Sequence, residues 1–177
     1  MGNETFAEEN PAYAVLYKPG ADNDWSARVV DLECGVVTGS RCRLTKEPDA
    51  YAVLYTPQPD GKWLAEIVDL PACKASRPEI AQARATAKDS AKKALASYVE
   101  RGEAAPKPVT ICYYTRPSDF QTHGGTEDTI LEAVEEAVGK AVAQHRKDHG
   151  AAPRSSSVCG YLTLSDDTNT HDDGATE

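Results

Sequence analysis

The chain of 177 residues has no long apolar run, and its N-terminus has neither a basic start nor an apolar core. A membrane-spanning helix needs about 18 apolar residues in succession, and a secretory signal needs both of the missing N-terminal features. We therefore expect a cytoplasmic protein without a membrane segment. Hydrophobic residues make up 40% and charged residues 27% of the chain, as in ordinary soluble globular proteins.

The sequence also lacks the patterns that hold metals and phosphates. The five cysteines form no Cys-x-x-Cys motif, which favours reduced thiols over a disulfide framework. Cys34 and Cys42 have no histidine or cysteine neighbour at zinc spacing, and no third ligand accompanies His145 and His149. There is no glycine-rich phosphate loop of the Rossmann or P-loop type. We expect no metal and no cofactor.

Basic residues are outnumbered, 19 against 28 acidic ones, and the net charge is −9. The excess acids lie at the two ends, so we expect a flexible acidic N-terminus over 1–11 and a disordered acidic tail over 165–177. The rest of the chain is close to neutral. Direct binding of nucleic acid, which needs clustered cations, is not expected.

Two segments repeat each other without a gap, one beginning at Ala12 and the other at Ala50. Thirteen of 21 aligned positions are identical. Each copy alternates tyrosine and valine in a first strand, continues through a turn, and enters a second strand that contains a tryptophan. The repeat predicts a duplicated β-hairpin.

After the hairpins the two copies diverge. In the second copy Ser76 and Glu79 have the spacing of a capping box, and a helix to about Glu100 is expected behind them. The first copy runs into Pro48 without such a helix. We therefore expect residues 12–48 to supply strands only, either to the sheet of residues 49–108 or to another chain. Residues 109–164 predict a strand, a helix from Thr126 to about His149, and a strand, as a β-α-β extension of the same domain.

Residues 50–108 resemble the HicB-like antitoxin family. The resemblance rests on the tyrosine-led strand, Asp60-Gly61, the segment Asp69-Leu70-Pro71-Ala72-Cys73, the helix behind it, and a Gly102-Glu103 tail followed by Pro106 and Pro108. It implies an α+β fold of partial RNase H-like type, with an antiparallel-rich sheet, helices on one face and the unit order β-β-β-α-β. The chain departs from the family in having Ala72 where a glycine is expected, and in having no recognisable DNA-binding module.

The resemblance implies a non-enzymatic antitoxin that binds and neutralises a small basic toxin ribonuclease of HicA-like type. One alternative is a HicB-like module reused as a stand-alone or homodimeric scaffold. Another is a divergent RNase H-like hydrolase, although neither of the central strands that would carry its carboxylates contains an acid, and Asp119 lies in a loop.

No residue is predicted to be catalytic, and Cys112 is expected to be a buried strand cysteine rather than a nucleophile paired with His123. The candidate partner-binding residues are aromatic side chains of the repeat, which serve equally well as core, and the end of the second strand. They are Tyr13, Tyr17, Trp25, Tyr51, Tyr55, Trp63, Asp69 and Leu70.

Overall fold

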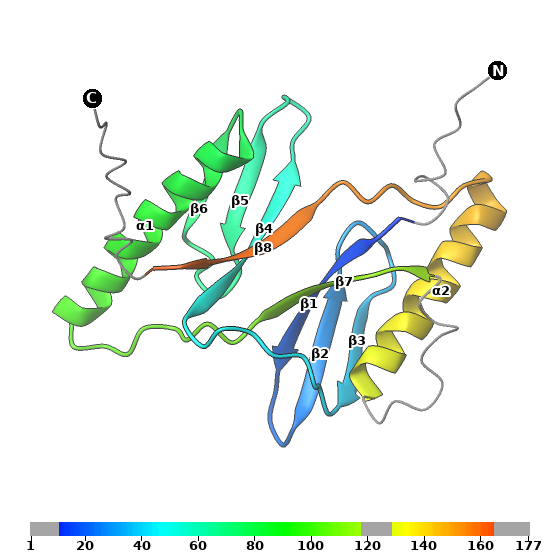
Figure 1. Ribbon diagram of the computed structural model, residues 1–177, viewed down its shortest axis with the longest axis horizontal. Helices are drawn as coiled ribbons and strands as arrows, with labels where there is room; N and C mark the ends of the chain where they lie inside the picture. Colours follow the sequence, from blue (N-terminus) through cyan, green and yellow to red (C-terminus); the bar gives the residue numbers. More distant parts are fainter. Residues whose placement is uncertain (1–10, 118–128, 165–177) are drawn as a thin grey trace, which may run out of the picture.

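The computed structural model describes residues 11–117 and 129–164, which form an α+β fold with two antiparallel four-stranded sheets (Figure 1). The first sheet has the order β3-β2-β1-β7, and the second has the order β6-β5-β4-β8. The first contains β1 (Tyr13–Pro19), β2 (Asp24–Val29), β3 (Val36–Ser40) and β7 (Ile111–Thr115). The second contains β4 (Ala50–Pro57), β5 (Trp63–Ile67), β6 (Lys74–Arg77) and β8 (Val158–Thr163).

The two repeated segments form hairpins with equivalent registers. Val15 pairs with Val29 in the first hairpin, and Val53 pairs with Ile67 in the second. A third antiparallel strand follows in each case, β3 beside β2 and β6 beside β5. The expectation that residues 12–48 would extend the sheet of the second copy is wrong, because they form a separate sheet whose fourth strand is β7.

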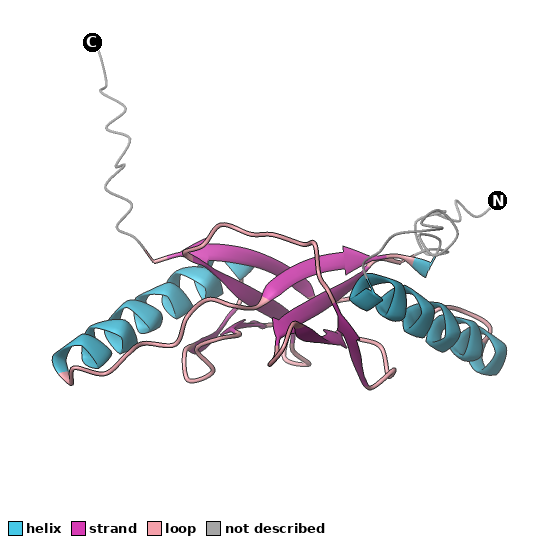
Figure 2. Cartoon of the chain, turned by 90° about the horizontal axis from the view of Figure 1, so that it is seen from below, coloured by secondary structure: helices cyan, strands magenta, loops and turns pink. Residues whose placement is uncertain are grey.

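One helix covers the outer face of each sheet. Helix α1 (Ile80–Glu100) packs on β5 and β6, and helix α2 (Thr129–His149) packs on β2 and β3. The first copy therefore has a helical cover after all, and it comes from a distant part of the chain. Figure 2 shows the strands in the middle of the molecule with the two helices on opposite sides. Neither helix combines the length and apolar character needed to cross a membrane.

The last strand of each half pairs with the other half. β7 follows α1 along the chain but pairs with β1, whereas β8 follows α2 but pairs with β4 (Figure 1). The expected order of strand, helix and strand over residues 109–164 is thus observed, but β7 and β8 belong to different sheets. This exchange ties the two halves together through main-chain hydrogen bonds.

Both faces of the central strands are buried, which explains their continuous apolar sequence. Tyr13, Val15 and Tyr17 face α2, whereas Ala14 and Leu16 face the other sheet. Strand β4 repeats this arrangement between α1 and the first sheet. The inner faces of both sheets meet in one small cluster, made of Ala14, Leu16, Ala52, Leu54, Cys112 and Cys159.

The helices use side chains of different size at equivalent positions. Helix α1 buries Ala83, Ala87 and Ala91, and helix α2 buries valine or isoleucine at the corresponding places. These side chains recur every fourth residue, which places them on one face of each helix. The predicted end of α1 at Glu100 is confirmed.

The predicted capping box at the start of α1 does not form. Ser76 belongs to β6, where it pairs with Leu64, and its hydroxyl donates a hydrogen bond to the Gln58 side chain. Glu79 occupies the N-cap position and makes no side-chain capping bond. The strand pairing of Ser76 takes precedence over its local capping role. The predicted cap at Thr126 lies outside the described residues.

Candidate docking groove

The structure places most of the predicted partner-binding residues in the hydrophobic core. Tyr13, Tyr17, Tyr51 and Tyr55 are at most 6% exposed, and Leu70 is 4% exposed. Trp25 and Trp63 are partly buried against the same two core clusters. These tyrosines and Leu70 therefore offer little surface to a partner. The sequence alternation could not reveal this, because it places the tyrosines on one face of each strand but does not show that a helix covers that face.

Asp69 follows the end of β5, and its carboxylate bonds to the start of β7, the strand that pairs with the other half of the chain. One of its carboxylate oxygens accepts hydrogen bonds from the N–H groups of Val109 and Thr110, at 2.9 and 2.8 Å. Its other oxygen accepts one from the Thr110 hydroxyl, at 2.7 Å. Asp69 thus fixes the start of β7, although the sequence suggested only a turn or a partner contact for it.

Asp31 makes the equivalent contacts in the first half. Its carboxylate accepts hydrogen bonds from the N–H groups of Ser156 and Ser157, at 2.9 and 2.6 Å, and from the Ser157 hydroxyl, at 3.0 Å. Ser157 and Thr110 are almost fully buried, with 4% and 1% exposure. The two carboxylates therefore anchor β8 and β7 at equivalent places.

Two more tyrosines join the sheets across the inner cluster. The hydroxyl of Tyr161 accepts a hydrogen bond from the Cys112 N–H at 2.7 Å and donates one to the Cys112 carbonyl. Tyr114 makes the same pair of bonds with Cys159. Burial raises the pKa of Tyr161 to about 12. Both phenols therefore act as neutral donors and acceptors between the edge strands.

Alkaline pH is expected to destabilise the fold through Tyr161. Its folded-state pKa of about 12 exceeds the usual value of about 10, so the stabilisation is complete below pH 10 and is lost as pH rises through 12. The substitution Tyr161→Phe should reduce this dependence and cost about 1.5 kcal/mol at pH 7, because the Cys112 N–H loses its acceptor. Denaturant unfolding at pH 7 and pH 11 measures both effects. If Tyr161→Phe changes the free energy of unfolding as little as Tyr113→Phe, at an exposed tyrosine, the role given to Tyr161 is contradicted.

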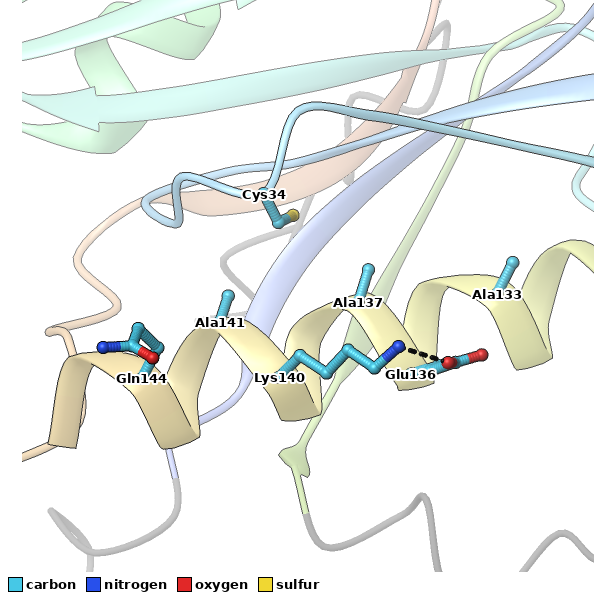
Figure 3. Close-up of a pocket in the computed structure, with 7 residues that line it drawn as sticks. All are labelled: Cys34, Ala133, Glu136, Ala137, Lys140, Ala141 and Gln144. Carbon is cyan, nitrogen blue, oxygen red and sulfur yellow. Dashed lines mark hydrogen bonds and ion pairs between the residues drawn. The ribbon is translucent and has the colours of Figure 1, made fainter. Parts of the chain in front are cut away.

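A groove runs along the exposed side of α2, opposite the loop between β2 and β3 (Figure 3). It has a volume of about 550 Å³. A second hollow of about 510 Å³ continues toward the C-terminal end of α2 and shares Ala141 and Gln144 with the first. We call the two together the α2 groove. Its main lining residues are Asp31, Glu33, Cys34, Ala133, Glu136, Ala137, Lys140, Ala141, Gln144, His145, Asp148 and His149.

The helix side of the α2 groove combines small apolar side chains with charges. Ala133, Ala137 and Ala141 lie one turn apart along the helix and point toward Cys34 in Figure 3. Methyl groups leave room for another chain to approach the helix closely. Burial raises the pKa of the Cys34 thiol, which keeps the thiol neutral, so Cys34 serves as an apolar contact.

Acidic residues line the α2 groove from both sides. Asp31 and Glu33 come from the loop, and Glu136 and Asp148 come from the helix. The Lys140 ammonium group lies 2.6 Å from the Glu136 carboxylate and lowers the pKa of Glu136. The groove therefore combines an apolar floor, flanked by the Glu136–Lys140 ion pair, with a second hollow that carries three acidic side chains.

The corresponding surface of the second half has a different charge. Pro71 stands where the first half has Glu33, and Arg101 stands where it has Asp148. Helix α1 also contains four cations, Arg84, Lys88, Lys92 and Lys93. Two halves of similar architecture thus differ in the charges along their helices.

The described residues include no group of three or more side chains of the metal-binding types that could hold an ion. The imidazole rings of His145 and His149 have centroids 4.4 Å apart and planes tilted by 41°, and His145 Nδ1 lies 2.7 Å from the Ala151 carbonyl oxygen. Cys112 is 8% exposed, which confirms its predicted burial. Asp119 and His123 lie outside the described residues.

Comparison with protein-family models, curated proteins and solved structures finds no match to this chain. The α2 groove was not predicted from the sequence. The alanines at every fourth position of the helix were the available signal, but such a stripe normally belongs to a buried face.

Proposed function

We propose that this chain is a cytoplasmic partner-binding protein of the HicB-like antitoxin type, and that it binds a small basic toxin ribonuclease. The observation that carries the proposal is the α2 groove, in which a floor of alanines continues into a hollow lined by Asp31, Glu33 and Asp148. Small side chains permit close packing of a partner, and carboxylates at the rim complement positive charge. The partner is thus identified by its charge and by the narrow apolar ridge that it must insert.

The arrangement of the elements supports the resemblance to that family. Strands β4, β5 and β6, helix α1 and strand β7 follow one another in the expected order β-β-β-α-β. Strands β1, β2 and β3, together with α2 and β8, make a second unit with the same order. In this proposal the chain contains two HicB-like units, with the second inserted between the third strand and the helix of the first.

The charge difference between the halves favours one partner for each chain. A basic protein is attracted to the α2 groove, where Glu33 and Asp148 add negative charge. The equivalent surface of the second half has Pro71 and Arg101 in their places, which removes both negative charges and adds a positive one. Association should therefore be faster at low salt, because ions screen these exposed charges.

The substitution Ala137→Arg is expected to abolish partner binding. It places a long cation on the floor of the α2 groove, where it fills space and repels a basic protein. Ser90→Arg is the matched control, since Ser90 occupies the equivalent position on α1. Native mass spectrometry of the tagged proteins, isolated from the native host at low salt, should show a stoichiometric small basic companion with the wild type and with Ser90→Arg.

The companion should be absent from Ala137→Arg. The purified companion should cleave RNA in a nuclease assay, and adding the wild-type chain should suppress that activity. Equal loss in both variants would place the partner outside the α2 groove. A wild-type protein that appears only as a monomer or homo-oligomer under every growth condition would contradict the antitoxin proposal and favour a stand-alone scaffold.

A further inference from the structure

Two buried cysteines face each other where the sheets meet. Cys112 lies on β7 and Cys159 on β8, and both belong to the small cluster between the inner faces of the sheets. Each is 8% exposed. They occupy equivalent positions in the two halves, since Cys112 pairs with Leu16 of β1 and Cys159 pairs with Leu54 of β4.

The contacts around these cysteines hold the two strands in place. The Cys112 thiol lies 3.7 Å from the carbonyl oxygen of Gly160, the residue next to Cys159. The Tyr161 and Tyr114 hydroxyls bond the main chain of the opposite cysteine. Both cysteine side chains belong to the same inner cluster. They are thus neighbours on strands that belong to different sheets.

We propose that Cys112 and Cys159 form a reversible disulfide under peroxide, which covalently joins the two sheets. The tyrosine hydroxyls already hold the main chain of both strands beside the two cysteines. The inference does not depend on the antitoxin proposal, since it concerns the interior between the sheets and not the α2 groove.

The chemistry needs one molecule of hydrogen peroxide. The Cys159 thiolate attacks a peroxide oxygen, the O–O bond breaks, and a sulfenic acid and hydroxide result, with the hydroxide taking the proton released by Cys159 to form water. The Cys112 sulfur then attacks the sulfenic sulfur, forms the S–S bond and releases a second water molecule with its own proton. The two thiols lose two electrons and two protons, and the peroxide is reduced to two water molecules.

The surroundings favour Cys159 as the attacking sulfur. The hydrogen bond from the Cys112 thiol lowers the pKa of Cys159, whereas the same contact and burial raise the pKa of Cys112. The first proton therefore leaves Cys159, and Cys112 remains a protonated neighbour that resolves the sulfenic acid. The disulfide that results is the same whichever of the two sulfurs attacks first.

The remaining cysteines occupy other places. Cys34 and Cys42 are partly buried near α2, and Cys73 is 2% exposed in the core under α1. A full-length variant with Cys34→Ser, Cys42→Ser and Cys73→Ala retains only the proposed pair. It separates the inner disulfide from oxidation elsewhere, and wild-type protein studied in parallel shows whether the pair also reacts first when all five thiols are present.

The test treats both proteins with hydrogen peroxide and then measures intact mass, peptide linkage and denaturant stability. The expected product has lost two hydrogens, links the peptides of Cys112 and Cys159, and returns to the starting mass with a thiol reductant. Its unfolding midpoint should rise because the bond closes a long loop in the unfolded chain. Added oxygen atoms without a crosslink, or a wild-type crosslink between other cysteines, would overturn the proposal, as would an unchanged mass.

Cys159→Ser in the three-substitution background provides the matched control. This variant keeps Cys112 as its only thiol and should gain neither an intramolecular crosslink nor a higher midpoint. A midpoint that rises equally in this control would show that peroxide stabilises the protein by another route and would contradict the assignment.

Discussion

The substitution Asp69→Ala is expected to lower the free energy of unfolding by about 3 kcal/mol. Alanine removes an acceptor of three hydrogen bonds, and it leaves the Thr110 N–H and hydroxyl without a partner in a position that is 1% exposed. A buried donor without an acceptor carries a desolvation cost, and bonds to a carboxylate are stronger than neutral ones. Denaturant unfolding followed by circular dichroism measures the change.

Two further variants separate the contribution of hydrogen-bond geometry to stability from that of the charge. Asp69→Asn keeps an oxygen for the two N–H groups and places an amide beside the Thr110 hydroxyl, so it should cost less than half as much. Asp60→Ala, an exposed aspartate that bonds only its own turn, should change stability by less than about 0.5 kcal/mol. A loss for Asp69→Ala no larger than for Asp60→Ala would show that the anchor of β7 contributes little.

Asp31 links the architecture of the first half to its surface. It anchors β8 in the same way as Asp69 anchors β7, and it also lines the α2 groove. Its contacts with Ser156 and Ser157 fix the loop that faces α2. The shape of the groove therefore depends on the same carboxylate that organises the strand exchange, so the interior and the candidate docking surface are not independent.

Local patterns in the sequence were enough to predict the hairpins and the end of α1. Alternating side chains, turn residues and a helical spacing of alanines all act within a few residues of one another. The end of α1 at Glu100 followed from Gly102, whose positive φ suits a helix terminus. These features need no knowledge of the rest of the chain.

The assignment of elements to sheets could not be predicted in this way. Nothing near β7 indicates that it pairs with β1, and nothing in residues 12–48 indicates that α2 covers them. The strand sequences are compatible with either sheet, since both central strands are buried on two faces. The choice depends on long-range anchors such as Asp31, which are separated from their partners by most of the chain.

The candidate site could not be predicted from the sequence for a related reason. Conspicuous aromatic residues such as Tyr17 were the natural choice for partner contacts, but both sheets and both helices enclose them. The α2 groove instead depends on Ala133, Ala137 and Ala141, which are inconspicuous in a sequence. A groove that forms because its side chains are small can be recognised only when the positions of the helix and the opposite loop are known.

Gly39→Ala is expected to destabilise the first half by about 2 kcal/mol, because this glycine lets β3 and α2 approach closely. A Cβ atom at Gly39 would lie 2.9 Å from the Cα atom of Ile130 and 3.1 Å from its nitrogen. Both atoms belong to the main chain of the first turn of α2, so no side-chain rotation relieves the contact. The helix must move away from β3, and Ile130, which is fully buried, must partly leave the core.

Gly160→Ala is the matched control, because Gly160 also lies in a strand but has open space around the position of a Cβ atom. It should change stability by less than about 0.5 kcal/mol, or increase it slightly, since glycine weakens a strand. Denaturant unfolding compares the two, and hydrogen exchange should show faster exchange in α2 of Gly39→Ala but not in α1. Equal effects of the two alanines, or loss of protection in both helices alike, would mean that the close approach at Gly39 does not set the position of α2. If hydrogen exchange becomes faster in α2 alone, the contact between α2 and β3 also determines the width of the α2 groove.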